Sequence, residues 1–173
     1  MQPLIIAFLF LMAMPGERQE PAWQQFTSNE GRFSARMPSD PRINTQVTNT
    51  KEGSLLTHMV SSTDDNLNEF MVSWTEYQNP NFEQRGTEAT FNKMRDALVA
   101  VNHGKVLNES VISAGGHPAR AYTFSTSEGR IITVRFYFVG NRFYQVMAQT
   151  KPENTDSVER FFESFKFMPG TLV

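Results

Sequence analysis

The feature that most constrains the fold is a pair of apolar segments, residues 130–139 and 142–149, separated only by Gly140 and Asn141. Two such segments around a glycine turn predict a β-hairpin with a two-residue loop. The expected pairs are Phe138 with Phe143, Phe136 with Gln145 and Val134 with Met147 on one side, and Tyr137 with Tyr144, Arg135 with Val146 and Thr133 with Ala148 on the other. Both sides are largely apolar, whereas a two-layer antiparallel domain leaves one face in water. Each side of this hairpin therefore needs a cover.

Two helical patterns supply candidates for the covers. Residues 83–102 carry apolar side chains at helical spacing, and Asn102-His103-Gly104 is typical of a helix end; the stripe consists of Phe91, Met94, Leu98 and Val101, with Ala97 between them. Near the carboxyl end, Asp156 followed by Glu159 predicts a capped helix start. The apolar stripe of this second helix consists of Val158, Phe161, Phe162 and Phe165.

The remaining patterned segments alternate as strands do and end at turn residues. They are residues 31–37, 43–49, 54–62, 70–77, 105–113 and 119–126. We therefore expect an α+β fold: an antiparallel sheet of six to eight strands with helices on both faces, an α/β/α sandwich. No low-complexity tract or charge block interrupts the chain after residue 23. Residues 23–173 are expected to form a single domain.

The amino-terminal segment has a different character. Leu4 to Met14 is an unbroken apolar run that ends at Pro15-Gly16, which is short for a membrane span but typical of the apolar core of a signal peptide. Residues 1–22 are therefore interpreted as a signal peptide and short linker, with Gly16 and Ala22 as candidate cleavage positions. The protein is then secreted or periplasmic. An uncleaved membrane anchor and a folded segment are the alternatives.

Composition narrows the function classes. The 173 residues include no Cys, 16 Lys+Arg and 18 Asp+Glu, with a formal net charge of -2. A chain without cysteine has no disulfide, no Cys-ligated zinc or iron–sulfur centre and no cysteine nucleophile. The near-neutral balance argues against nucleic acid as a partner, because binding to phosphates needs a basic surplus or stripe.

Three short motifs give the chain a family resemblance. They are Phe26-Thr27-Ser28-Asn29-Glu30-Gly31-Arg32-Phe33-Ser34 with Met37-Pro38 behind it, Gly116-His117-Pro118-Ala119-Arg120, and the run from Val158 to Phe167. With the order of strands and helices, they resemble the PsbP-like fold group, which includes exported bacterial domains of unknown function. The resemblance covers about residues 23–168. It implies a fold and brings no catalytic residues.

Motifs for metal binding and catalysis are weak. Asp64, Asn66 and Asn68 match the first ligands of an EF-hand loop, but Glu69 replaces the required glycine and Thr75 the final glutamate. A solvated hairpin loop explains this segment better. His58, His103 and His117 have no ligand-type neighbour at a metal-binding spacing. No nucleophile elbow, P-loop or zinc-protease motif occurs, so we expect no metal and no cofactor.

Arg135 is the strongest candidate for ligand binding. It is placed within a strand, on the side that carries Tyr137 and Tyr144, and a guanidinium there can bind an anion. A salt bridge to Glu76 or to a helix carboxylate, or a side chain extended to water, is the favoured explanation of this position.

The sequence therefore favours an exported, non-enzymatic binding or accessory domain for an envelope protein or a small ligand. A hydrolase with a site assembled from loops is the first alternative. A membrane-tethered accessory subunit that retains its leader is the second.

Overall fold

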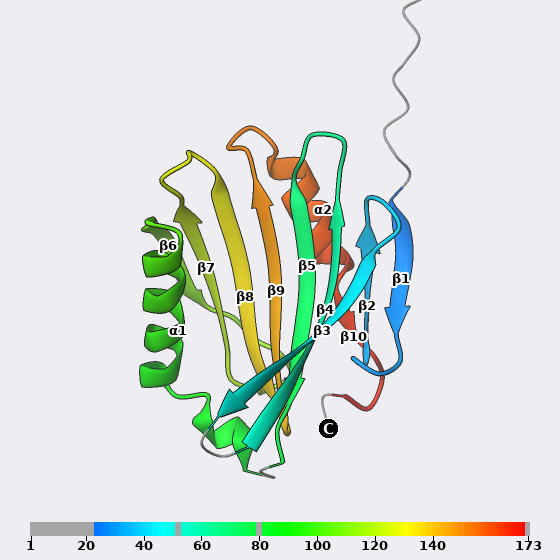
Figure 1. Cartoon of the computed structure of the whole chain (residues 1–173), viewed down its shortest axis with the longest axis vertical. Helices are drawn as coiled ribbons and strands as arrows, with labels where there is room; N and C mark the ends of the chain where they lie inside the picture. Colours follow the sequence, from blue (N-terminus) through cyan, green and yellow to red (C-terminus); the bar gives the residue numbers. More distant parts are fainter. Residues whose placement is uncertain (1–22, 51–52, 79–80, 172–173) are drawn as a thin grey trace, which may run out of the picture.

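The computed structural model describes residues 23–50, 53–78 and 81–171, and the expected signal peptide lies outside them. The described chain forms two antiparallel sheets, two α-helices and one short 3-10 helix (Figure 1). No helix in the described ranges is long and apolar enough to cross a membrane.

The larger sheet has seven strands in the order β3-β4-β5-β9-β8-β7-β6, and every neighbouring pair is antiparallel. Its strands are β3 (Arg42–Thr50), β4 (Gly53–Thr63), β5 (Glu69–Glu76), β6 (Lys105–Val111), β7 (Ala119–Ser125), β8 (Ile131–Val139) and β9 (Arg142–Thr150). The sheet therefore consists of a three-stranded meander, β3-β4-β5, and a four-stranded meander, β6-β7-β8-β9, which meet where β5 pairs with β9. This junction places residues about seventy positions apart in the sequence side by side.

The hairpin of β8 and β9 is confirmed in its register. All six pairs expected around Gly140-Asn141 are present, including Phe136 with Gln145 and Tyr137 with Tyr144. Gly140 has a φ of 58°, which the first central residue of a two-residue hairpin turn requires and which a side chain disfavours. Alternation and one turn residue were sufficient to set this register.

One face of the large sheet is covered over its central strands, and we call it the closed face. The cover consists of α2 (Thr155–Ser164) and a second sheet of three strands, β1 (Gln24–Ser28), β2 (Phe33–Met37) and β10 (Lys166–Phe167). Between the layers lies an aromatic core. Its large members are Phe33, Phe70, Trp74, Tyr137, Tyr144, Phe161, Phe162 and Phe165. In Figure 1, α2 lies behind the large sheet and β1 and β2 lie at its side.

The opposite face is covered in part, and we call it the open face. The 3-10 helix η1 (Phe82–Arg85) and helix α1 (Glu88–Val101) place Phe82 and Phe91 against β7 and β8. Thr87 caps α1 by accepting a hydrogen bond from the Thr90 amide. The single helix expected over residues 83–102 is thus divided at Gly86. It ends as expected, and a Cβ at Gly104 would collide with the carbonyl of Ser125.

The expected α/β/α sandwich is wrong. Strands make up about 50% of the described residues and helices about 20%, in a mostly β fold with two antiparallel sheets. The segment 31–37 was assigned to the main sheet, but it is β2 of the small sheet. An apolar strand face requires a cover without specifying its kind, and here a second sheet supplies much of it.

The amino-terminal cap of α2 also differs from the expectation. Asn154 occupies the cap position without a side-chain capping hydrogen bond, and Asp156 lies in the first turn of the helix. The Asn154 side chain instead donates to Oδ1 of Asn68 at 3.2 Å. A tertiary contact has therefore replaced the local cap.

Candidate ligand-binding groove

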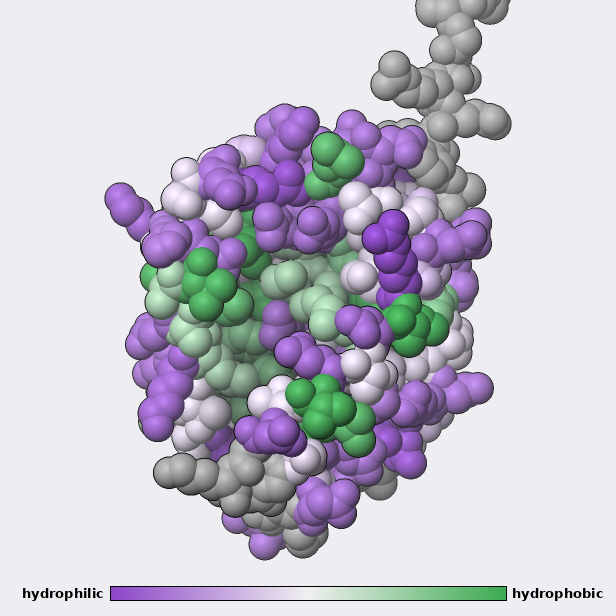
Figure 2. Space-filling model, viewed as in Figure 1, coloured by the Kyte–Doolittle hydropathy of each residue, from purple (hydrophilic) through white to green (hydrophobic). Residues whose placement is uncertain are grey.

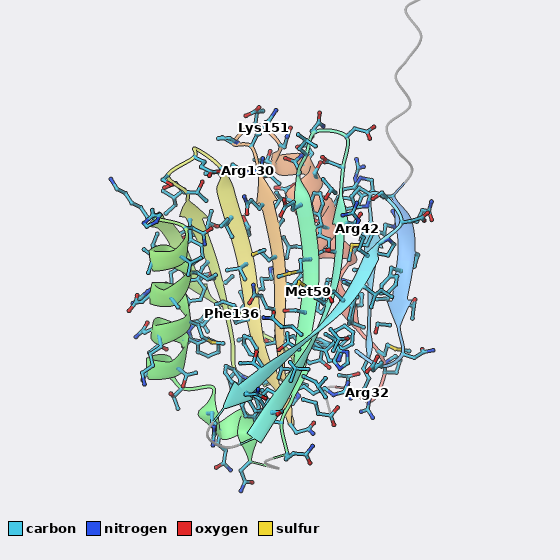
Figure 3. The ribbon with its side chains drawn as sticks, in the orientation of Figure 1. Arg32, Arg42, Met59, Arg130, Phe136 and Lys151 are labelled. Atoms are coloured by element: carbon cyan, nitrogen blue, oxygen red, sulfur yellow. The ribbon has the colours of Figure 1, made fainter. Side chains whose placement is uncertain are left out.

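The open face carries a partly uncovered region over β4, β5 and β9. Strand pairing aligns two rows of side chains across it: Met59, Ser73, Gln145 and Phe136 in one, and Ser61, Met71, Met147 and Val134 in the other. Figure 3 shows Met59 on β4 and Phe136 on β8, with β5 and β9 between them. Figure 2 shows a hollow over the middle of this face, with apolar side chains inside and hydrophilic ones around it.

Two hollows open on this face. The first has a volume of about 440 Å³ and is lined by Met59, Met71 and Met147, with Arg42 at its margin. The second has a volume of about 580 Å³ and lies between η1, α1 and the ends of β8 and β9, where its apolar lining is Tyr77, Phe82, Met94, Phe138 and Phe143. Along β9, Met147 lines the first hollow, Phe143 lines the second, and Gln145 lies between them on the same face. We call the two hollows together the groove.

Methionine supplies most of the apolar lining of the first hollow and one residue of the second. Met59, Met71, Met94 and Met147 are all half-buried. An unbranched thioether adapts to ligands of different shape at little cost, which is why methionine recurs at adaptable binding surfaces. Sites for small molecules have volumes of roughly 300–1,000 Å³ and combine apolar walls with a few polar groups. Both hollows fall within that range.

The groove also carries polar side chains, and the lining of the first hollow includes Ser39, Ser61, Ser62 and Thr63. Gln145 Nε2 contacts Met147 Sδ at 3.7 Å, which is a weak use of an amide donor. Ser73 is buried beside it, and the hydroxyls of Thr57 and Thr75 are 2.7 Å apart. An amide next to thioethers leaves hydrogen-bonding capacity for a ligand.

Charges on the two hollows differ. The first carries Arg42 together with Asp40 and Glu69. The charged residues that line the second are Arg85 and Lys93, both cationic. Burial raises the pKa of Tyr77 above its usual range, and the positive charge of Arg85 lowers it in part. The potential of Arg85 therefore reaches the aromatic wall of the second hollow, which is suited to an anionic group.

The site residues expected from the sequence lie on the other side of the sheet. Arg135, Tyr137 and Tyr144 are together on the closed face, and none of them lines either hollow. The Arg135 guanidinium lies 4.6 Å from the ring centre of Phe162 on α2, a cation–π contact. Burial raises the pKa of Tyr137 and of Tyr144, and the neighbouring Arg135 and Arg142 guanidinium groups respectively oppose it. Packing thus explains the three positions, and ligand binding there stays a prediction.

The acidic loop between β4 and β5 has a structural role. One oxygen of Asp64 accepts the amides of Asn66 and Asn68, and the other accepts Nδ2 of Asn68. Asn68 is fully buried, and its Oδ1 accepts the Lys151 amide at 3.2 Å. Arg130 joins the same end of the sheet by donating to the carbonyls of Leu67 and Gln149, and Figure 3 shows Arg130 and Lys151 there. The described residues contain no cluster of three metal-ligating side chains.

The histidines form two pairs with carboxylates. His117 Nδ1 lies 2.7 Å from Glu83 Oε1. The other carboxylate oxygen of Glu83, Oε2, accepts a hydrogen bond from the Gly140 amide. His58 stacks on Trp74 with ring centres 4.9 Å apart, and its Nε2 lies 3.4 Å from Glu30 Oε1. His103 follows α1 with a φ of 46°. These pairs join segments distant in the sequence, so spacing alone gave no signal for them.

One of these pairs includes a hydroxyl. Thr45 Oγ1 is 3.2 Å from His58 Nδ1, which completes a hydroxyl–imidazole–carboxylate chain with Glu30. In the serine hydrolase arrangement the hydroxyl contacts Nε2 and the carboxylate contacts Nδ1, beside an oxyanion hole. Here the ring nitrogens are exchanged, Thr45 is on an exposed strand, and neither Thr45 nor His58 lines a hollow. The order of the ring nitrogens therefore differs from that of a serine hydrolase, and the hydroxyl is on an exposed residue.

Comparison with known proteins assigns this chain to no family. The chain matches no protein-family model and no curated protein. The PsbP-like resemblance therefore rests on its three motifs, and the function rests on the groove.

Proposed function

We propose that this protein is an exported, non-enzymatic binding domain whose groove holds a small amphipathic ligand with an anionic head. The observation that carries the proposal is the uneven coverage of the large sheet. The closed face is covered over its central strands by a second sheet and α2, whereas the open face keeps two hollows, lined by three half-buried methionines in the first and by Met94 with aromatic residues in the second. Hollows of this volume are typical of sites that bind small molecules.

The chemistry of the lining supports this class of ligand. An acyl or aromatic body would lie over Met71, Met147 and Met94, where it removes apolar surface from water. The anionic head would lie at the second hollow, whose charged lining residues are Arg85 and Lys93. Gln145, between the hollows, would hydrogen bond to a polar atom of the ligand.

Fluorescence titration with 1-anilinonaphthalene-8-sulfonate, an anionic amphipath, tests the proposal. We expect saturable binding by the folded domain, and at least about tenfold weaker binding by Met71→Glu, because the new carboxylate lies in the apolar floor. Val111→Glu is the matched control, since Val111 is an exposed strand residue that lines neither hollow. Equal loss in both variants, or no saturable binding by the native protein, would contradict the proposal.

A second pair of probes tests the position of the anionic head. Lys93→Glu should weaken binding of the anionic probe severalfold, because it reverses one of the two charges at the second hollow. Binding of Nile red, which is neutral, should change little. If both probes lose affinity equally, Lys93 acts through the shape of the groove and the anionic assignment is wrong.

The hydrolase alternative has the Thr45–His58–Glu30 chain in its favour. Activity toward p-nitrophenyl acetate that disappears in both Thr45→Ala and His58→Ala would support it and overturn the non-enzymatic proposal. We expect no difference between these variants and the native protein.

Export and tethering are tested by the mass of the chain recovered from its natural source. Loss of the first 16 to 22 residues is the expected result for a cleaved signal peptide. A chain that retains them and partitions with membranes would instead be the tethered accessory subunit.

A further inference from the structure

The large sheet has two edge strands, β3 and β6, and they differ in how they are protected. Edge strands expose unpaired backbone groups, and proteins usually guard them with charges, bulges or short length. Strand β6 has a register shift between Val106 and Asn108, starts with Lys105, and carries Glu109 paired with Arg95 at 3.1 Å. These are the usual defences of a free edge.

Strand β3 lacks these defences. Its nine residues pair with β4 without a register shift, and only its first residue, Arg42, is charged. Its sequence after Arg42 is rich in residues that favour strands. Within the described residues, β3 has no strand neighbour other than β4. A long, regular and nearly uncharged edge is a template for another strand.

The backbone of β3 shows which residues point outward from the sheet. The Thr45 amide donates to Oδ1 of Asn44 at 2.8 Å and so does not belong to the ladder with β4. In an antiparallel strand, alternate residues direct both backbone groups to the same side. Ile43, Thr45 and Val47 therefore direct their amides and carbonyls to the free edge, where an added strand would replace Asn44 Oδ1 as the acceptor of the Thr45 amide.

An apolar stripe accompanies this edge. Ile43 is 67% exposed, Val47 is 59% exposed and Leu56, which pairs with Val47 across the hairpin, is 49% exposed. Val47 and Leu56 belong to the end of the β3–β4 hairpin beyond the residues that pair with β5. Figure 1 shows this end of the hairpin projecting at the lower front of the molecule.

We propose that β3 pairs with β3 of a second copy of this chain, antiparallel and about a two-fold axis at Thr45. Only residues whose backbone groups face the free edge can form hydrogen-bonded pairs with each other. Because these residues have odd numbers, the two numbers of every such pair add to an even sum. The register centred on Thr45 places Ile43 of one copy opposite Val47 of the other, twice by symmetry. Centring on Gln46 would place Ile43 opposite Asn49 instead. The chosen register also places Arg42 opposite Thr48, so no like charges meet.

Self-pairing fits better than addition of a strand from a different protein. A two-fold contact uses the same patch on both copies, and β3 is complementary to itself in one register: two apolar pairs flank a central threonine pair. The second copy would extend the apolar stripe from Leu56 and Val47 of one copy to Ile43 of the other. Apart from Arg42, the residues that line the groove lie outside β3.

The absence of cysteine makes the register directly testable. Opposed residues in a hydrogen-bonded antiparallel pair have Cα atoms about 5.5 Å apart, within the range that a disulfide spans. Under mild oxidation Thr45→Cys should form a disulfide-linked dimer on a non-reducing gel. Ser110→Cys, at an exposed position of the guarded edge β6, should stay monomeric.

Sedimentation equilibrium of the cysteine-free chain provides the second readout. The native protein should sediment as a dimer, and Val47→Lys should weaken the dimer by at least about tenfold in Kd, because two lysines enter the apolar pairs. Circular dichroism confirms that the variant is folded, and Ile43→Lys repeats the test at the opposed position. A monomeric native protein, or a dimer that both lysine variants leave unchanged, would overturn the proposal. Equal cross-linking of Thr45→Cys and Ser110→Cys would overturn the assignment of β3 as the pairing edge.

Discussion

Both faces of the seven-stranded sheet carry apolar strand residues, but they differ in what covers them. On the closed face, aromatic rings from β2, β5, β9 and α2 meet edge to face, as Phe33 and Trp74 do with ring centres 5.7 Å apart. On the open face, aromatic rings under α1 continue into the lining of the second hollow, whereas three flexible methionines line the first. Rigid rings specify one packing, whereas thioethers tolerate several. The comparison separates the part of the sheet that holds the fold from the part suited to binding.

The largest expected effect is on the closed face. Phe161 on α2 is fully buried and lies 5.3 Å from the ring of Phe70. Phe161→Ala should lower the free energy of unfolding by about 3–5 kcal/mol, the usual cost of a cavity left by a buried phenylalanine. Urea unfolding measures this. A loss below about 1 kcal/mol would mean that α2 does not seal the closed face.

The next largest effect concerns the buried amide that fixes the start of α2. Asn68→Ala should cost about 2–3 kcal/mol, because it removes hydrogen bonds to Asp64, Lys151 and Asn154. Asn66→Ala is the matched control, because only the backbone amide of Asn66 bonds to Asp64. Equal urea midpoints for the two variants would show that the contact does not anchor the cover.

A pH effect tests the covered part of the open face. Burial raises the pKa of Tyr122 to about 12, whereas an unfolded tyrosine titrates near 10.0. The unfolded chain therefore releases this proton first, so the contribution of Tyr122 to stability is complete below pH 10 and is lost as pH rises toward about 12. Urea unfolding across this window should show a steeper loss for the native protein than for Tyr122→Phe. Parallel curves would place Tyr122 in water and contradict its packing under α1.

The smallest effect is expected in the groove. Met71 is half-buried on the open face, so Met71→Ala should cost about 1 kcal/mol or less, since part of its side chain is already in water. The same urea series measures it beside Phe161→Ala. A loss as large as that of Phe161→Ala would show that the groove is part of the packed core.

Some of this fold followed from the sequence because the determining signals are local. Strand alternation and Gly140 set the β8–β9 register, and the apolar stripe of α1 with its glycine end placed most of that helix. The layers did not follow, because the same apolar face accepts a helix or a sheet. The amino-terminal segment around Phe33 looks like any alternating strand, and only its pairing with β10 shows that it belongs to a second sheet.

The candidate site was harder to predict than the fold. A charged residue on an apolar strand predicts ligand binding at Arg135, yet its packing on Phe162 explains this position. The groove depends on Met59, Met71 and Met147, which come from three strands and read individually as core residues. Their common signal, methionine at alternate positions of neighbouring strands, appears only when the strand order is known. What α1 leaves uncovered is a property of tertiary packing.

The most direct test of the central claim is an NMR titration of the protein labelled with carbon-13 at the methionine methyl groups, using 1-anilinonaphthalene-8-sulfonate as the probe. Met59, Met71, Met94 and Met147 line the groove, whereas Met37 is fully buried in the closed-face core. We expect the four groove signals to shift in a saturable manner while the signal of Met37 stays in place. Unchanged groove signals, or shifts of Met37 equal to theirs, would contradict the assignment of the open face as the binding site.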